Sequence, residues 1–203
     1  MENQYISQII ETGKRMYERG YNVSIDGNIS IRLGPNEILM TRSGARLGEL
    51  KPTDILVVDL EGNRQRGEGT PSSERNLHLQ IYKVRPEVNA VIHAHAPNCI
   101  ALSLSDIDTL NLTYIALAPI PITEFAMPSS PESFEKLKPF VMDYNWAILR
   151  RHGIVTYEQN IEAAFLRLEG MEHGAKILLA ARVAGPLTPV DAITRERLLQ
   201  TWK

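Results

Sequence analysis

The stretch VIHAHAPN, residues 91–98, predicts a short buried strand that carries two histidines and ends at a proline. Residues two apart on a strand point to the same face and lie about 7 Å apart along the backbone. His93 and His95 can therefore direct their rings toward a single metal ion. A chance pair of half-buried histidines would show the same pattern, so the remaining ligands decide between the two interpretations.

A third ligand has to come from a short list, because the chain has five histidines in all. His152 is the natural choice, since it follows the apolar run 146–149 and precedes Gly153, at the end of a second predicted strand. A carboxylate is the other possibility. Three neutral imidazoles with an open fourth position are typical of a catalytic zinc site rather than a closed structural one.

The composition is that of an ordinary globular protein. A length of 203 residues predicts a single domain over 1–203, with a C-terminal tail from about 186. The formal charge of -2 provides no basic field for nucleic acid or an anionic membrane. One cysteine, Cys99, excludes an internal disulfide, and no apolar run approaches the ~20 residues of a spanning helix. We therefore expect a cytoplasmic protein.

Apolar periodicity predicts both helices and strands. Three short strands follow one another before residue 61 and suggest an antiparallel sheet at this end of the chain. The strands are expected near residues 28–31, 38–41 and 55–60, and the helices near 6–19, 74–84, 97–104, 134–142 and 161–183. Residues 110–121 are predicted to form a strand or irregular core, and residues 123–131 a loop.

Several turns carry glycines and hydroxyls that could hold an anion. Ser72 and Ser73 precede a predicted helix, where either is a credible N-cap, and the same position also suits a phosphate. For this segment alone the N-cap is the favoured interpretation. Three further positions at strand ends have the same double meaning, and a phosphate site would recruit Gly27, Asn28, Ser43 and Gly44.

Taken together, these groups describe carbon-acid chemistry on a phosphorylated ketose. A metal on the three histidines would polarise a carbonyl. Glu74 could remove a proton from the adjacent carbon, and the phenol of Tyr114 could give a proton to an oxygen. Sequence spacing alone does not show that these segments meet.

In order along the chain, GNIS at 27–30, TRSG at 41–44, PSSE at 71–74, HAH at 93–95 and HG at 152–153 resemble the signature of the class II aldolase/adducin family. The resemblance runs from about residue 6 to 185 and is strongest to the fuculose-1-phosphate aldolase branch. It implies a three-layer α/β/α fold with a mostly antiparallel central sheet. It also implies a homotetramer whose active sites lie at subunit interfaces.

The resemblance further implies a role for each site residue. Zinc, with cobalt or manganese as alternative ions, would bind His93, His95 and His152. Glu74 would be the acid/base, and Tyr114 from a neighbouring subunit would protonate the aldehyde oxygen. The phosphate would be held by the glycines, serines and asparagine already named. The implied reaction is reversible cleavage of a ketose 1-phosphate to dihydroxyacetone phosphate and an aldehyde through a metal-stabilised enediolate.

Two alternatives remain open within and outside enzyme chemistry. Related 4-epimerases have an aspartate where this chain has Glu74, which favours an aldolase, but methylthioribulose-phosphate dehydratases share the glutamate. A metal-binding structural or interaction module without turnover is the alternative of another class. Adducin-like heads lack the histidine triad that this chain keeps.

The chain also departs from the family pattern. Arg42 stands where the family usually has proline, and Asp26 stands where a small residue is more usual. No tyrosine follows Tyr157, whereas the fuculose-phosphate enzymes use one in the C-terminal tail. The aldehyde half of the substrate is therefore the part that the sequence predicts least.

Overall fold

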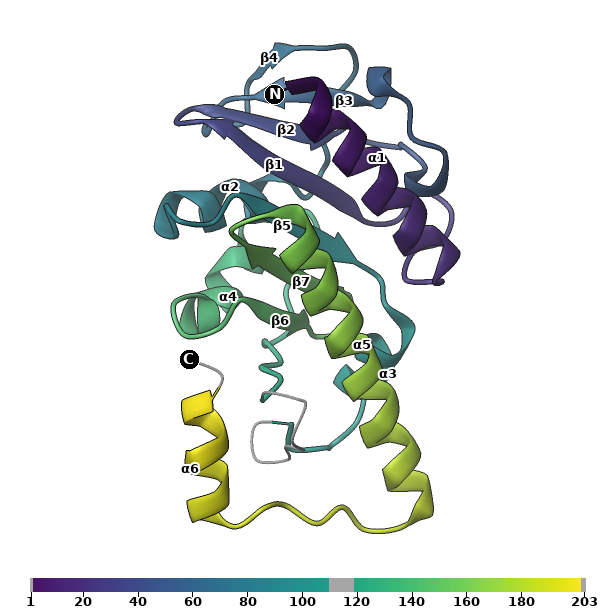
Figure 1. Cartoon of the computed structure of the whole chain (residues 1–203), viewed down its shortest axis with the longest axis vertical. Coiled ribbons are helices and arrows are strands. Elements are labelled where there is room, and N and C mark those ends of the chain that lie inside the picture. The colour runs from purple at the N-terminus through teal and green to yellow at the C-terminus, as the bar shows by residue number, and fades with distance from the viewer. Residues whose placement is uncertain (1, 110–118, 202–203) are drawn as a thin grey trace.

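The computed structural model describes residues 2–109 and 119–201, and its centre is one seven-stranded sheet (Figure 1). All the strand pairs are antiparallel. From one edge to the other the order is β4 (Arg64–Arg66), β3 (Ile55–Val58), β2 (Glu37–Thr41), β1 (Asn28–Gly34), β5 (Ala90–Ala94), β7 (Gly153–Glu158) and β6 (Trp146–Leu149). The predicted meander and the mostly antiparallel sheet are confirmed.

Helices cover both faces of the sheet and make the three layers expected from the sequence (Figure 1). One face carries α1 (Glu2–Glu18), α3 (Pro97–Ser103) and α5 (Ile161–Ala184), and the other carries α2 (Arg75–Val84) and α4 (Glu132–Val141). Two short 3₁₀ helices, Leu47–Glu49 and Pro52–Asp54, lie between β2 and β3. A last helix, α6 (Ala192–Thr201), lies apart from the sheet, toward the C-terminus.

Alternation along the strands divides the apolar side chains between two cores. On β5, Ile92 packs into the core with Phe165 of α5, and Val91 packs into the opposite core with Leu77 of α2. Every residue of β5 is buried. A strand covered on both faces reads as a continuous apolar run, and here only His93 interrupts that run.

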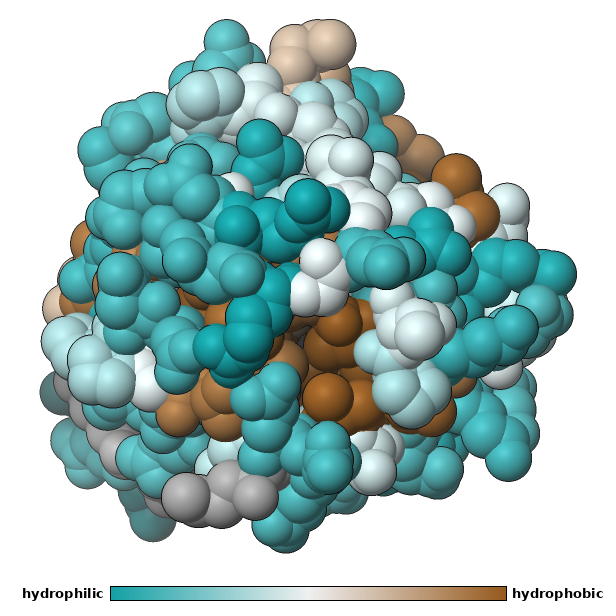
Figure 2. Space-filling model, turned by 90° about the horizontal axis from the view of Figure 1, so that it is seen from above, coloured by the Kyte–Doolittle hydropathy of each residue, from teal (hydrophilic) through white to brown (hydrophobic). Residues whose placement is uncertain are grey.

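The edge of the sheet at β4 is short and polar. All three β4 residues are exposed, and Arg66 forms ion pairs with Glu2 and Glu37. Seen from this end, the surface is mostly hydrophilic, with small hydrophobic areas between polar side chains (Figure 2). Charged side chains on a short edge strand discourage pairing with another chain.

Three details differ from the sequence predictions. Strand β7 was not predicted, and His152 lies in the turn between β6 and β7 rather than at a strand end. The tail from about residue 186 contains α6. The serines are not the N-cap of α2: Glu74 occupies that position, and the Ser72 hydroxyl accepts a bond from the Glu74 backbone N–H at 3.2 Å.

Within the described residues, we find no helix both long and apolar enough to cross a lipid bilayer.

Candidate active site

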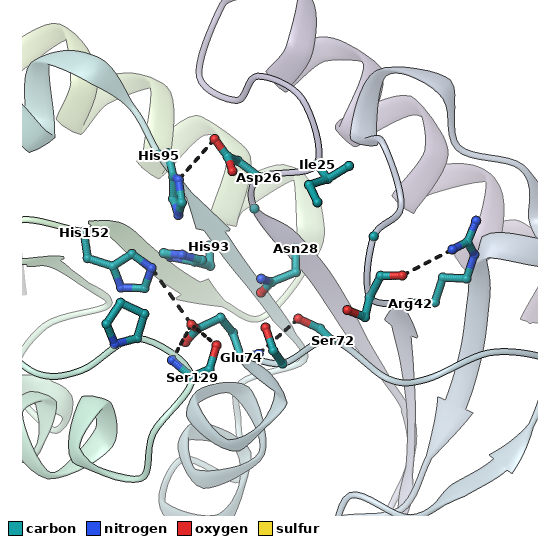
Figure 3. A pocket seen from close by; sticks show the side chains of 15 residues that line it. Ile25, Asp26, Asn28, Arg42, Ser72, Glu74, His93, His95, Ser129 and His152 are labelled. Atoms are coloured by element: carbon teal, nitrogen blue, oxygen red, sulfur yellow. Dashed lines mark hydrogen bonds and ion pairs between the residues drawn. The ribbon is translucent and has the colours of Figure 1, made fainter.

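Three histidines converge at the centre of the sheet (Figure 3). His93 lies on β5, His95 directly follows this strand, and His152 lies in the turn that leads into the neighbouring β7. One potential ligand nitrogen from each ring lies within 4.8 Å of the other two. Ring centroids are 4.7–5.1 Å apart. The other described histidines lie outside this group: His78 is buried against Ser30, and His173 is exposed on α5.

The chemistry of His93 fits a metal ligand. Its Nδ1 donates a hydrogen bond to the backbone carbonyl of Ile154 at 3.1 Å, which leaves Nε2 as an unprotonated acceptor. This Nε2 is buried and has no hydrogen-bond partner among the described residues. Burial, and secondarily the neighbouring His152 and His95 rings, hold the pKa of His93 well below its usual value. A neutral imidazole oriented by a carbonyl is the form that binds a divalent ion.

Close backbone packing brings the ligands together. Gly153 begins β7 directly after His152, and a Cβ there would lie 2.4 Å from the Ala94 carbonyl oxygen and 2.9 Å from Cε1 of His93. A side chain at this position would push β7 away from β5. Glycine therefore allows the turn that carries the third histidine to approach the first two.

Asp26, in the loop before β1, lies beside the second histidine. Its Oδ2 is 3.4 Å from Nδ1 of His95 (Figure 3). Sequence analysis noted this aspartate only as a departure from the family pattern. Its contact with His95 depends on how the loop before β1 packs against β5, for which the sequence offers no signal.

Glu74 is held rigidly at the other side of the histidines. The side chain is buried, and its Oε1 accepts hydrogen bonds from the backbone N–H of Ser129 at 2.6 Å and from the Ser129 hydroxyl at 2.9 Å. The same oxygen lies 3.9 Å from Nε2 of His152. Ser129 has a φ of 61°, a left-handed conformation that is uncommon outside glycine. Strained backbone of this kind often occurs at functional sites, and sequence reasoning did not identify Ser129.

A cavity of about 260 Å³ joins these groups to the predicted phosphate residues. Asn28 enters from β1 and Arg42 from the end of β2. The buried Oδ1 of Asn28 has no partner among the described residues. The lining contains the three histidines, Glu74, Asp26, Ser129, Arg42 and all six predicted phosphate residues: Gly27, Asn28, Ser43, Gly44, Ser72 and Ser73.

Arg42 adds positive charge at the rim of this cavity. Its Nε donates to Asp54 at 2.7 Å and one terminal nitrogen donates to the Ser43 carbonyl at 3.2 Å. The guanidinium is thus held against the backbone of a predicted phosphate residue. Tyr114, the predicted proton donor, lies outside the described residues.

Comparison with known proteins agrees with this architecture. The family model of the class II aldolase and adducin N-terminal domain matches residues 7–179. An L-fuculose phosphate aldolase of Methanococcus maripaludis is 37% identical over 165 residues, which cover 80% of this chain and 89% of the relative. A 3-oxo-tetronate 4-phosphate decarboxylase of Haemophilus influenzae is 32% identical over 177 residues, 83% of this chain and 84% of the relative.

Further relatives extend the range of reactions while keeping the fold. A methylthioribulose-1-phosphate dehydratase of Pseudomonas syringae is 43% identical over 104 residues, 51% of this chain and 51% of the relative. A solved L-fuculose 1-phosphate aldolase superposes with a TM-score of 0.87 at 28% identity, covering 97% of this chain and 95% of that structure. Its arrangement of strands and helices is shared with the present chain, which belongs to the class II aldolase and adducin family.

Proposed function

We propose that this chain is a zinc-dependent class II aldolase that reversibly cleaves a ketose 1-phosphate to dihydroxyacetone phosphate and an aldehyde. The observation that carries the proposal is the meeting of three neutral-type histidines and one buried carboxylate, Glu74, in the cavity lined by the predicted phosphate residues. Such a set can hold a sugar phosphate, activate its carbonyl and move a proton at the next carbon.

One end of the cavity suits the phosphate. Backbone N–H groups and hydroxyls of Ser43, Ser72 and Ser73 can donate to its oxygens, and Arg42 adds a cation. Asn28 offers a side-chain amide whose Oδ1 is not otherwise used within the described chain. These groups bind the substrate and orient its carbonyl end toward the histidines.

The other end suits proton transfer. His93, His95 and His152 would hold the divalent cation, which when bound supplies a Lewis acid for the ketose carbonyl. In the direction of synthesis, Glu74 accepts a proton from the hydroxymethyl carbon next to that carbonyl. The new carbon–carbon bond then forms to the aldehyde carbon, and Tyr114 gives its proton to the aldehyde oxygen. Ser129 keeps the Glu74 carboxylate in one orientation during this exchange.

The proposal includes the surroundings of the enzyme. It comprises a single domain over 1–203 with the tail from about 186, a cytoplasmic location, and a homotetramer in which a neighbouring subunit supplies Tyr114. The resemblance to the fuculose-phosphate branch, whose aldolases are among the relatives, supports the assembly. Cobalt or manganese are the alternative ions for the same histidines.

A dehydratase is the second candidate, because a methylthioribulose-1-phosphate dehydratase is also a relative and Glu74 suits proton removal in both reactions. Each would use the same cavity and the same proton at the carbon beside the carbonyl. They differ in the bond that then breaks, a carbon–carbon bond or a carbon–oxygen bond. The identity of the product therefore separates them.

The test is dihydroxyacetone phosphate release from a panel of ketose 1-phosphates by the zinc-loaded chain, with a chelated control. We expect release that chelation abolishes, and a loss of 10²- to 10⁴-fold in kcat with retained zinc for Glu74→Gln. Glu124→Gln, an exposed residue of the loop that carries Ser129, is the matched control and should keep full activity.

Other outcomes would contradict the proposal. Consumption of substrate without the triose phosphate would establish the dehydratase or epimerase. Tight zinc binding without turnover of any ketose phosphate would favour a metal-binding module. Full activity in Glu74→Gln would refute the proton-transfer role of this carboxylate.

A further inference from the structure

We propose that Asp26 is a positioning residue that orients His95 for metal binding and sets the affinity of the site for its ion. The inference rests on the metal site of the proposed function, and it does not depend on which bond the enzyme breaks. It concerns a carboxylate that touches a ligand from behind and is not one of the three converging side chains.

The geometry selects one form of the His95 ring. Asp26 Oδ2 faces Nδ1 at 3.4 Å, and the other ring nitrogen points toward the two remaining histidines (Figure 3). An ionised carboxylate only accepts hydrogen bonds, so Nδ1 carries the proton and Nε2 keeps its lone pair for an ion. Among the described residues we find no other acceptor for this Nδ1.

The same arrangement occurs at His93, where the partner is a backbone carbonyl. Ile154 orients His93 from Nδ1 and leaves Nε2 toward the site. Two ligands thus share one design, and the difference lies in the charge of the partner. A carboxylate raises the basicity of an imidazole ligand more than a neutral carbonyl does, because it stabilises the positive charge that the ring acquires on binding a cation.

The backbone anchors Asp26 next to its target. The Asp26 N–H bonds the Val23 carbonyl at 3.0 Å, which closes the turn that precedes β1. Gly27 follows with a φ of +76°, and a Cβ on it would lie 2.8 Å from the His93 carbonyl oxygen. Asn28 then pairs opposite His93 in the sheet. The turn therefore packs directly onto β5, so the carboxylate is placed by the sheet rather than by a free loop.

The charge of Asp26 acts on the site without competition. In the described part of the chain, no lysine or arginine forms an ion pair with Asp26. Its side chain is 35% exposed and His95 is 28% exposed, so solvent screens the contact only in part. A divalent ion held by three neutral imidazoles gains from one uncompensated carboxylate nearby.

The experiment measures zinc affinity on the full chain by competition with a chromophoric chelator, for wild type, Asp26→Asn and Asp26→Ala. We expect zinc affinity to fall 10- to 100-fold in Asp26→Ala. Asp26→Asn keeps an acceptor oxygen but not the charge, so its loss should be smaller. Asp143→Asn removes an exposed charge on the loop after α4 and should leave zinc affinity unchanged.

Thermal unfolding with chelator present checks that the variants fold alike without metal. Unchanged zinc affinity in Asp26→Ala, whether or not KM for the ketose phosphate rises, would overturn the inference and assign Asp26 to the substrate or to neither. A wild-type chain that binds no zinc would overturn both proposals. A chain that binds zinc with the expected Asp26 dependence but releases no triose phosphate would overturn the aldolase alone.

Discussion

Replacing Gly153 by alanine should damage metal binding and stability together. The added Cβ would stand 2.4 Å from the Ala94 carbonyl oxygen, 2.9 Å from Cε1 of His93 and 3.2 Å from Cδ2 of His95. The first of these atoms belongs to the backbone of β5, so a side-chain rotation cannot relieve the contact. The two strands have to separate by several tenths of an ångström or more.

The cost can be estimated from packing. Overfilling a packed interior typically costs about 1–3 kcal/mol, and for a domain of this size each kcal/mol lowers Tm by about 2–4 °C. Ligand distances to zinc tolerate changes of only about 0.2 Å. His152 adjoins Gly153 and would move relative to the other two histidines, so we expect zinc affinity to fall at least about tenfold, or about 1.4 kcal/mol.

The assay combines urea unfolding of the metal-free chain with chelator competition for zinc. Gly170→Ala is the matched control, because nothing lies within 4 Å of a Cβ on this glycine of α5. Alanine inside a helix should stabilise the chain by about 0.5–1 kcal/mol and leave zinc binding unchanged. Equal stability and zinc affinity in Gly153→Ala and wild type would refute the close approach of β7 to His93 and His95.

Two further predictions concern buried groups beside the site. Burial lowers the pKa of His78 to about 3, so the unfolded state binds this proton more readily and stability falls as pH drops from about 6.5 toward 3, by up to about 1.4 kcal/mol per unit. Urea unfolding of the metal-free chain should show a shallower pH dependence in His78→Gln but not in the exposed His173→Gln, and identical slopes would contradict this. Glu172 accepts bonds from the backbone N–H groups that begin α3, so Glu172→Gln should lower the unfolding free energy by about 1.5–3 kcal/mol. Glu169→Gln, which removes a surface ion pair, should cost less than about 1 kcal/mol by the same assay, and an equal cost in both variants would argue against the cap.

Much of the fold could be predicted because its signals are local. Apolar spacing is visible within one turn of helix or a few residues of strand, and it located α1, α5 and the first three strands. Strand β7 was missed because Gly153, directly after a histidine, looks like the end of an element rather than its beginning. Helix α6 has no described residue in the buried core, so it lacks the apolar stripe by which a helix is recognised.

The candidate site divides in the same way. The His-x-His spacing and the choice of His152 could be inferred, and the structure brings these rings together. The contacts of Asp26 with His95 and of Ser129 with Glu74 join loops whose neighbours are set by strand pairing far along the chain. The serines before α2 were weighed as caps because hydroxyls favour that position, yet Glu74 takes it and Ser72 bonds the Glu74 backbone. The role of Tyr114 stays a prediction.

The order of the strands has a consequence for how the protein is assembled during folding. Strands β1 to β4 follow one another as hairpins, and β6 and β7 form another, so each set closes over a short loop. The β1–β5 pairing that sets Asn28 opposite His93 joins distant parts of the chain and must overcome a larger loop-closure entropy. All three histidines belong to the later set, and the phosphate residues belong to the earlier part of the chain. A nascent chain could therefore capture its ion before it can hold a substrate, and amide exchange at β1–β5 would report when the two abilities are joined.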